Sequence, residues 1–500
     1  MIHYSSTTAV DLSFTGNLSQ GGLNRDSQHQ RPHIHILDDY SLLNIFSFSR
    51  PAILDESEVD ESQFSEDGEW KLEQWWFRLV QVCRRWRYIV LESASRLRLS
   101  LVCARGSPVA DMLAHSPLPV IIDHFDKHHD ITAEDAEGII LALQHRDRVR
   151  RIRLRKSVPI LQKVINSLDG DFPILEYLLI EPQRLQWPFV EVDMNLPETF
   201  RAPHLRHLLL MRFDIPIGSP LLTTMGSLVT LSLNLIPHSA YFDPNALLQR
   251  LSLMPQLEIL GIYFDTHFPS QTKRQLLRTP IMTRVTLPNL RWLGFKGDSA
   301  YLEALLPQVT IPLLEKLQVY FSNHVNYSIP HLQQFVSTAE NLWPDTITLA
   351  FRPGWLEMMA YPHEGARMYT LSLSLGGRSL DWQIVAAIQV LHTFRTVFSV
   401  VEHLTLKYGA FKSSRDVPPD RIRWRELLGL FVNVKTLFVD RWLVQQLSRV
   451  LRPGKGESLT ELLPELQELS CPVTPTSVNA FTPFIDARQK AGRPVTMMHL

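Results

Sequence analysis

Closely spaced histidines are the residues of this 500-residue sequence best suited to metal chemistry, because imidazole nitrogens are common zinc ligands. One pair is His33 and His35, and the other is His128 and His129. Neither pair has cysteine or carboxylate ligands at a spacing typical of zinc sites, so we expect solvated histidines and no bound metal. The stretch RPGKGES, beginning at Arg452, lacks the first glycine of a phosphate-binding loop. The motifs GxGxxG, HExxH and GxSxG are absent as well, which predicts a non-catalytic protein without a cofactor.

A run of basic residues offers a different kind of chemistry. RDRVRRIRLRK, from Arg146 to Lys156, contains seven Arg and Lys residues. Side chains alternate between the two faces of a strand, so Arg151, Arg153 and Arg155 share one face if Ile152 and Leu154 face a core. Such a strip suits a phosphorylated or acidic peptide, because guanidinium binds phosphate and carboxylate in a bidentate manner. The alternatives are a solvated basic face, or one that holds an acidic segment of the same chain.

Composition limits the classes of protein that remain. Apolar residues make up 45% of the chain, charged residues 20%, and the net charge is −1. These values indicate a folded protein with no global attraction to nucleic acid or to acidic membranes. Three cysteines are too few for a disulfide framework, and no apolar run is long enough to span a bilayer, so we expect a cytoplasmic or nuclear protein.

A repeated pattern, L-x-x-L-x-L, must provide the frame for any of these residues. Its period is about 23 to 33 residues, and a helical pattern follows most copies. The first positions of the copies are Val149, Leu175, Leu205, Leu228, Leu257, Leu290, Leu314, Met368, Val401, Val434 and Leu466. The gap between Leu314 and Met368 holds one degenerate unit, PDTITLAF. This period is typical of leucine-rich repeats.

The repeats predict an α/β fold over residues 106–475, an irregular solenoid with a curved parallel sheet and helices on its convex side. Residues 476–500 are expected to cap it. An ordinary α/β domain with leucine-rich strands is the alternative. Strand alternation also places five residues on the concave face of later repeats, as a candidate protein-binding patch or an ordinary surface. They are Tyr263, Trp292, Lys296, Lys316 and Tyr320.

The first hundred residues have a different organisation. Residues 1–33 are rich in polar residues and are expected to form a disordered tail. A short helix is predicted after Leu37, and an acidic insertion, residues 55–69, separates it from a second helix that begins near Trp70. The second helix is predicted from an apolar stripe with spacings of three and four residues. Its members are Trp75, Leu79, Val82, Cys83, Trp86 and Val90.

Three segments carry a family resemblance: SLLNIF from Ser41, LVQVCRRWRYIV from Leu79, and SASRLRLSL from Ser93. Together with the repeats, they resemble fungal F-box proteins with a leucine-rich-repeat receptor. The sequence departs from the family in two respects, since Asp38 stands where the family usually has a proline after Leu37, and the acidic insertion is long.

The resemblance implies that residues 34–105 form a three-helix F-box-like module that docks on a Skp-type adaptor and, through it, on a cullin. The adaptor-binding residues that it implies are Leu37, Leu42, Leu43, Ile45, Phe46, Leu79, Val82, Cys83 and Trp86. The solenoid would then bind an unidentified substrate protein for ubiquitin transfer by other subunits.

Two alternatives remain open at this stage. The N-terminal helices could simply cap the solenoid, with their tryptophans buried as core. The chain would then be a repeat scaffold, or a protein that binds phosphate or nucleic acid through the strip at Arg146 to Lys156. The near-neutral net charge weighs against nucleic acid.

Overall fold

The computed structural model describes most of the chain. The described residues are 36–50, 74–125, 132–183, 194–265, 281–321, 329–377, 379–409, 421–452, 462–472 and 479–499. The predicted tail (1–33), the acidic insertion (55–69) and both histidine pairs lie outside these ranges. No helix among the described residues has the length and apolarity needed to cross a membrane.

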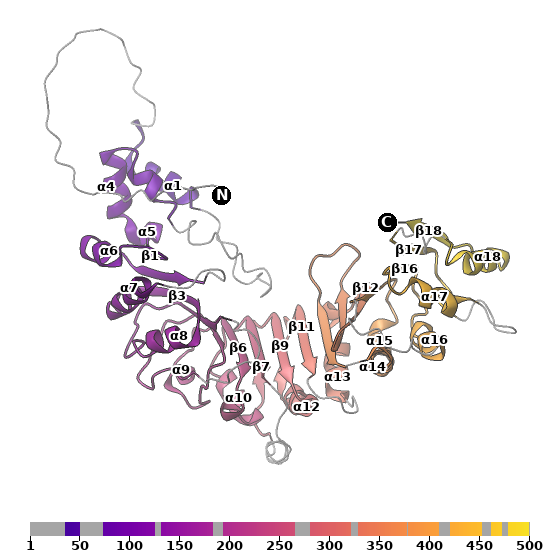
Figure 1. The fold of residues 1–500 in the computed structure, drawn as a ribbon. Helices are drawn as coiled ribbons and strands as arrows, with labels where there is room; N and C mark the ends of the chain where they lie inside the picture. Colours follow the sequence, from indigo (N-terminus) through magenta and orange to yellow (C-terminus); the bar gives the residue numbers. More distant parts are fainter. Residues whose placement is uncertain are drawn as a thin grey trace, which may run out of the picture.

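One curved sheet runs through the molecule from end to end and forms the inner surface of an arc (Figure 1). The described residues contribute 16 strands to it. In chain order these are β1 (Leu101–Cys103), β2 (Val120–His124), β3 (Val149–Lys156), β4 (Tyr177–Pro182), β5 (His207–Met211), β6 (Thr230–Ile236), β7 (Ile259–Phe264), β9 (Trp292–Gly297), β11 (Lys316–Phe321), β12 (Thr346–Arg352), β13 (Trp355–Tyr361), β14 (Leu371–Gly376), β15 (His403–Tyr408), β16 (Thr436–Val439), β17 (Glu468–Cys471) and β18 (Thr496–His499). A separate small sheet pairs β8 (Val285–Thr286) with β10 (Val309–Thr310).

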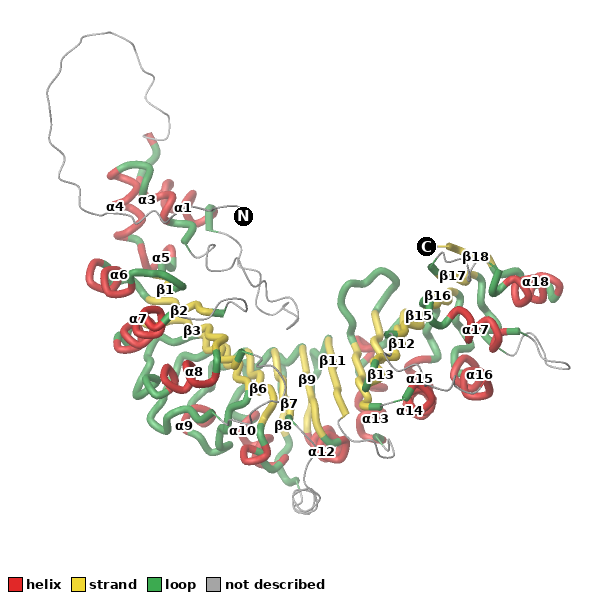
Figure 2. Tube along the Cα trace, viewed as in Figure 1, coloured by secondary structure: helices red, strands yellow, loops and turns green. Residues whose placement is uncertain are grey.

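Helices cover the outer, convex side of the arc (Figure 2). They are α6 (Val109–His115), α7 (Ala133–Gln144), α8 (Val158–Ile165), α9 (Pro220–Thr223), α10 (Pro244–Leu251), α12 (Ser299–Leu305), α13 (Pro330–Thr338), α14 (Leu380–Thr393), α15 (Arg395–Phe398), α16 (Arg421–Gly429), α17 (Val444–Leu451) and α18 (Thr482–Lys490). Some of these helices begin with an aspartate as the N-cap. Asp243 caps the first turn of α10 ahead of Pro244, for example, and Asp298 accepts a hydrogen bond from the amide of Ala300 at the start of α12.

The leucine pattern holds neighbouring repeats together. Leu178, Leu208, Leu231, Leu260 and Leu293 stand in register on β4, β5, β6, β7 and β9 and form a continuous ladder. Complete burial of one leucine side chain contributes about 1.5–3 kcal/mol, and each repeat buries its apolar residues only against its neighbours. The predicted solenoid with helices on its convex side is confirmed, and its sheet is mostly parallel.

The sheet is not parallel throughout, and here the structure corrects the prediction. Strand β13 runs antiparallel to both of its neighbours, β12 and β14. The spatial order is β11, β14, β13, β12, β15. After β11 the chain crosses the positions of β14 and β13 to form β12, returns through β13 and β14, and then crosses β13 and β12 to form β15. The degenerate unit PDTITLAF is β12, and the sequence between it and Leu371 adds a strand that the repeat count did not predict. Met368, the expected first position of its copy, is exposed in the loop before β14.

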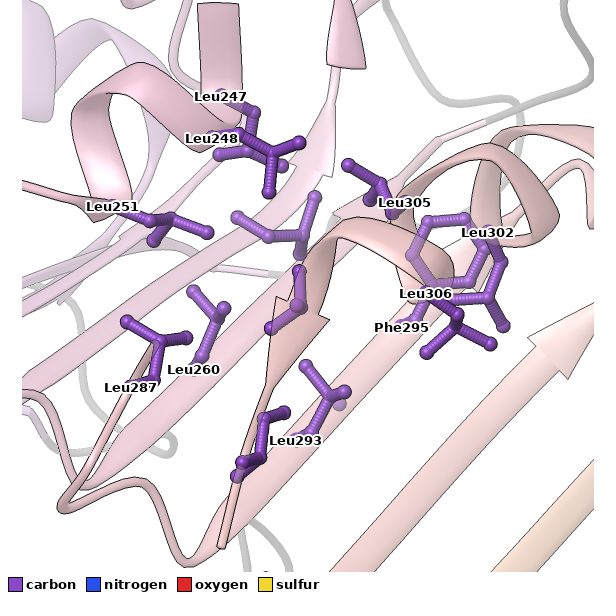
Figure 3. A pocket seen from close by; sticks show the side chains of 14 residues that line it. Leu247, Leu248, Leu251, Leu260, Leu287, Leu293, Phe295, Leu302, Leu305 and Leu306 are labelled. Carbon is purple, nitrogen blue, oxygen red and sulfur yellow. The ribbon is translucent and has the colours of Figure 1, made fainter. Parts of the chain in front are cut away.

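The core contains a small apolar cavity between α10, α12 and the strands beneath them (Figure 3). Its volume is about 40 Å³, and leucines such as Leu248, Leu260 and Leu302 line it together with Phe295. Ligand sites are typically about 300–1,000 Å³, so this space is a packing defect and not a binding site.

The N-terminal helices form a unit at one end of the arc (Figure 1). They are α1 (Asp39–Phe48), α3 (Phe77–Val80), α4 (Arg84–Glu92) and α5 (Ala94–Leu97). We call this unit the N-terminal module. Its buried residues, including Phe46, Trp76 and Val90, form a hydrophobic cluster that is separate from the core of the solenoid. Leu101 of β1 and Leu118 also belong to this cluster. The prediction of a single helix from Trp70 is wrong, because the chain leaves helical geometry at Cys83.

The other end of the arc closes differently. Residues 479–499 contribute α18 and β18, and β18 pairs in parallel with β17, so the terminal segment extends the sheet by one strand. The fully buried side chain of Arg488 on α18 donates from Nη2 to the carbonyl oxygens of Pro464 and Leu466, at 3.1 Å each. These bonds satisfy carbonyl groups at an end of the core where no further repeat follows among the described residues.

Candidate partner-binding surfaces

The residues that the resemblance assigns to adaptor binding fall into three groups in the N-terminal module, according to their exposure. Leu42, Leu43 and Phe46 are buried, and the Phe46 ring packs on that of Trp86 with centroids 4.7 Å apart. Ile45 and Val82 are exposed at 43% and 59%. Partial exposure characterises the remaining four, Leu37, Leu79, Cys83 and Trp86.

Arginines fasten α1 to the rest of the module, a role that the sequence did not reveal. Arg85 donates to the Asp39 carboxylate at 2.7 Å and to the carbonyl oxygen of Leu37 at 2.6 Å. Arg96 donates to Asn44 Oδ1 at 2.8 Å, and its guanidinium lies over the Tyr40 ring. The apolar core and these polar contacts together define the orientation of α1.

Cys83 has a structural role at the start of α4. Its backbone is extended, with φ −159° and ψ 171°, and its Sγ accepts a hydrogen bond from the amide of Trp86 at 3.5 Å. The thiol therefore acts as the N-cap of α4, in the place usually taken by a serine or aspartate oxygen. This interruption brings Val82 to the surface in the turn between α3 and α4.

The arginine strip lies where alternation predicts, opposite Ile152 and Leu154, but it is not open. Arg153 donates to the Asp123 carboxylate at 3.2 Å, and the two side chains are only 3% and 8% exposed. Arg155 donates to Glu181 Oε2 at 2.6 Å, and those side chains are 12% and 17% exposed. The Arg151 guanidinium lies over the Tyr177 ring.

These contacts correct the expectation of an anion-binding strip or a solvated basic face. The partners of the arginines come from the neighbouring strands β2 and β4, and Phe125, Tyr177 and Leu179 form a small apolar cluster on the same face. The acidic partners are visible in the sequence of the two adjacent strands. Asp123 stands opposite Arg153, and Glu181 stands opposite Arg155. An alignment of the neighbouring strands would therefore have predicted both ion pairs.

Farther along the concave face, the structure brings the five predicted residues together on neighbouring strands. Trp292 and Lys316 are opposite one another on β9 and β11, and the Tyr263 and Tyr320 rings lie 6.4 Å apart. Tyr369, from the loop before β14, joins them. The Lys316 ammonium is 5.7 Å from the centroid of the Trp292 ring and 4.3 Å from that of Tyr369. We call Tyr263, Trp292, Lys316, Tyr320 and Tyr369 the aromatic–lysine patch.

Two glycines create the space for Tyr263. A Cβ added to Gly261 would lie 2.7 Å from Tyr263 Cε2, and one added to Gly294 would lie 2.8 Å from Tyr263 Cζ. The ring therefore lies against these two positions, and Tyr263 as a whole is 7% exposed. Lys296, the fifth predicted residue, stands in register between Tyr263 and Tyr320, where burial lowers its pKa and Asp265 opposes that effect.

Buried titratable groups beneath α7 do not form an activated nucleophile. Burial, with a smaller contribution from Asp135, raises the pKa of Cys103 to about 12, so its thiol stays protonated. Burial lowers the pKa of His124 to about 4, so its imidazole is neutral near pH 7. Asp135 accepts hydrogen bonds from Gly106 and Thr132, which identifies it as a capping residue of α7.

A potential metal-ligand group is present among the described residues: Asp345, Glu402 and His403. Its donor atoms all lie within 4.8 Å of one another. This group could not be predicted from spacing, because Asp345 is more than 50 residues from the other two and only the strand register brings them together.

No protein-family model matches the chain, and no curated protein matches its sequence. Among solved structures, it is similar to the leucine-rich repeat-containing protein LegL7 from Legionella pneumophila, with 11% identity and a TM-score of 0.27. The match covers 80% of this chain and 99% of that one. A TM-score this low does not establish a shared fold. The assignment of a repeat solenoid therefore rests on the strand register described above.

Proposed function

We propose that this chain is a non-catalytic substrate receptor of an SCF-type ubiquitin ligase. In this role, the N-terminal module binds a Skp-type adaptor and through it a cullin, and the solenoid binds a substrate protein. The chain holds the substrate protein close to the ligase and so raises its effective concentration there, while other subunits carry out the ubiquitin transfer. A location in the cytoplasm or the nucleus would follow from this role.

The observation that carries the proposal is the division of apolar residues in the N-terminal module. Leu42, Leu43 and Phe46 build its core, while Ile45, Phe48 and Val82 remain 43%, 88% and 59% exposed. Ile45 and Phe48 are three residues apart on α1, so they lie on one side of that helix, exposed to a partner. Apolar side chains at the surface of a small rigid module are typical of a protein-docking site.

The aromatic–lysine patch supports the second half of the proposal. Tyr and Trp side chains bury large areas with few rotatable bonds, and they are enriched at the centres of protein interfaces. The patch lies on the concave face, on strands β7, β9 and β11, where a bound protein would contact several repeats at once. Repeat solenoids commonly use this face for binding.

The rival proposal, phosphate or nucleic-acid binding through the arginine strip, has no such support. Arg153 and Arg155 already pair with the carboxylates of Asp123 and Glu181. A phosphate would have to displace those partners from a face that is largely shielded from water.

Calorimetric titration of the full chain with a Skp-type adaptor tests the proposal. We expect the wild type to bind and Ile45→Asp and Val82→Asp to lose most of the affinity, because a carboxylate would be buried without a partner. The matched control is Ile422→Asp on α16, where the side chain is 70% exposed and far from the module along the chain. No binding by the wild type, or equal binding by all four proteins, would contradict the proposal.

A further inference from the structure

The inserted hairpin brings two segments together that are far apart in sequence. Asp345 directly precedes β12, Glu402 directly precedes β15, and His403 is the first residue of β15. Because β12 pairs in parallel with β15, with Thr346 opposite His403, these residues meet at the edge of the sheet where both strands begin. Two carboxylates and one imidazole then lie within 4.8 Å of one another.

Backbone hydrogen bonds fix Asp345 in this position. Its amide donates to the carbonyl oxygen of Tyr361 at 3.0 Å, and its own carbonyl oxygen accepts from the amide of Glu402 at 2.9 Å. The main chain of Asp345 is therefore held between β13 and β15. Ligands held by regular strand pairing lose little conformational entropy when they bind an ion.

The His403 ring has partners on both sides. Its Nδ1 is 2.7 Å from Thr436 Oγ1 on β16, and its Nε2 is 3.8 Å from Asp345 Oδ1. When Nδ1–H donates to the threonine, Nε2 keeps its lone pair on the side of Asp345. This arrangement is typical of metal-binding histidines, in which a hydrogen bond to one ring nitrogen orients the other toward the metal.

Two further charged residues complete the surroundings. Glu364, from the loop between β13 and β14, places Oε2 3.7 Å from His403 Nδ1. Lys435 Nζ is 2.6 Å from Glu402 Oε1 and leaves the second oxygen of that carboxylate available. Three carboxylates against one ammonium give this group an excess of negative charge, which a divalent cation would balance.

The same fold position elsewhere in the chain provides an internal comparison. His207 on β5 makes the equivalent cross-strand contact, with Nδ1 3.1 Å from Thr230 Oγ1. There, Arg206 stands where Glu402 stands, and Glu176 stands where Asp345 stands but is paired with Arg150 at 3.0 Å. The His–Thr contact is thus a feature that recurs in the sheet, whereas the pair of carboxylates beside the ring is specific to His403.

We propose that Asp345, Glu402 and His403 bind a divalent transition-metal ion, with Thr436 and Glu364 as supporting groups. One imidazole with carboxylates suits zinc. A tetrahedral ion with ligand distances of about 2.0–2.2 Å needs donor atoms about 3.4 Å apart, so small side-chain rotations close the site. The ion would link the start of the inserted hairpin to the next regular repeat, at the point where the sheet departs from its simple order.

Zinc binding by the full chain, first stripped of metal with EDTA, tests this proposal by calorimetry and by thermal unfolding. We expect the wild type to bind zinc and to unfold at a higher temperature in its presence, because the ion binds the folded state. His403→Gln and Asp345→Asn should weaken that binding by about 100-fold or more, beyond the usual effect of losing a supporting group. His207→Gln is the matched control and should leave zinc binding unchanged.

Glu364→Gln is a second variant that should not affect folding, because this side chain is 71% exposed. A loss of zinc affinity in this variant can therefore be attributed to the site. We expect about a tenfold loss of zinc affinity in a protein with an unchanged circular dichroism spectrum. Absence of zinc binding in the wild type overturns the proposal. So does binding that persists equally in His403→Gln, or a response to calcium alone that does not depend on His403.

Discussion

Arg153 on β3 and Asp123 on β2 form an ion pair 3.2 Å long on the concave face, and both side chains are almost completely buried. A run of arginines that predicts an open anion-binding strip therefore stabilises the junction of three strands instead. Arg153 and Arg155 have acidic partners within the chain, which directs the search for a partner protein toward the N-terminal module and the aromatic–lysine patch.

The buried pair leads to a prediction on stability. Asp123→Asn should lower the free energy of unfolding by about 3–5 kcal/mol, because it leaves the Arg153 guanidinium buried without a counter-charge. Denaturant unfolding of the full chain measures this change. Glu315→Gln is the control, since the Arg291–Glu315 pair is more than half exposed and should contribute at most about 1 kcal/mol. Equal effects of the two substitutions would show that the Arg153 pair is not buried.

Much of the fold could be predicted from the sequence, because burial in a solenoid repeats at a fixed spacing. Leu205, Leu208 and Leu210 are almost fully buried as the pattern requires. The hairpin of β12 and β13 could not be predicted in the same way. Both segments have strand-like composition, but the order of strands in a sheet depends on which edges pair, and no local signal states this.

The residues of the aromatic–lysine patch and of the N-terminal module could be predicted only in part. Alternation placed Trp292 and Lys316 on one face, but Tyr369 stands one residue before the corresponding position of its copy, in the loop before β14. The stripe from Trp75 to Val90 suggested one helix, because spacing alone does not reveal that Cys83 adopts an extended backbone. Resemblance suggested docking roles for Leu42 and Ile45 alike, and only burial distinguishes the core residue from the exposed one.

The glycines under Tyr263 lead to a second prediction. Gly294→Ala should cost about 1–2 kcal/mol of stability, because the new methyl group displaces the Tyr263 ring. Combined with Tyr263→Ala, the same substitution should cost much less, which a double-mutant cycle would detect as non-additivity. Gly218→Ala is the control, since nothing lies within 4 Å of the added atom. Additive effects of Gly294→Ala and Tyr263→Ala would contradict the packing of Tyr263.

His124 makes stability depend on pH. Burial lowers its pKa from 6.5 to about 4, with Asp135 opposing and Lys156 adding to the effect. Between these two values the unfolded chain binds more protons than the folded chain, so stability falls as the pH falls from 6.5 toward 4. The loss attributable to this residue is on the order of 3 kcal/mol. Urea unfolding of the wild type and of His124→Leu at several pH values measures this contribution. Equal dependence of the free energy of unfolding on pH in the two proteins would contradict the prediction.

The core of the N-terminal module leads to a fourth prediction. Phe46→Ala should destabilise this module by about 3–5 kcal/mol, because the Phe46 ring is fully buried against Trp86. Phe48→Ala, at an 88% exposed position two residues later, should change stability by less than about 0.5 kcal/mol. Limited proteolysis between residues 36 and 100 measures the difference. Equal susceptibility of the two variants would show that Phe46 does not support the module.

The central claim is that the N-terminal module binds a Skp-type adaptor while the solenoid remains available for a substrate. The most direct measurement is amide hydrogen exchange of the full chain with and without the adaptor. We predict slower exchange in α1 and in the turn around Val82, and unchanged exchange in β7, β9 and β11. Slower exchange in those three strands alone, or no change anywhere in the chain, would contradict the account.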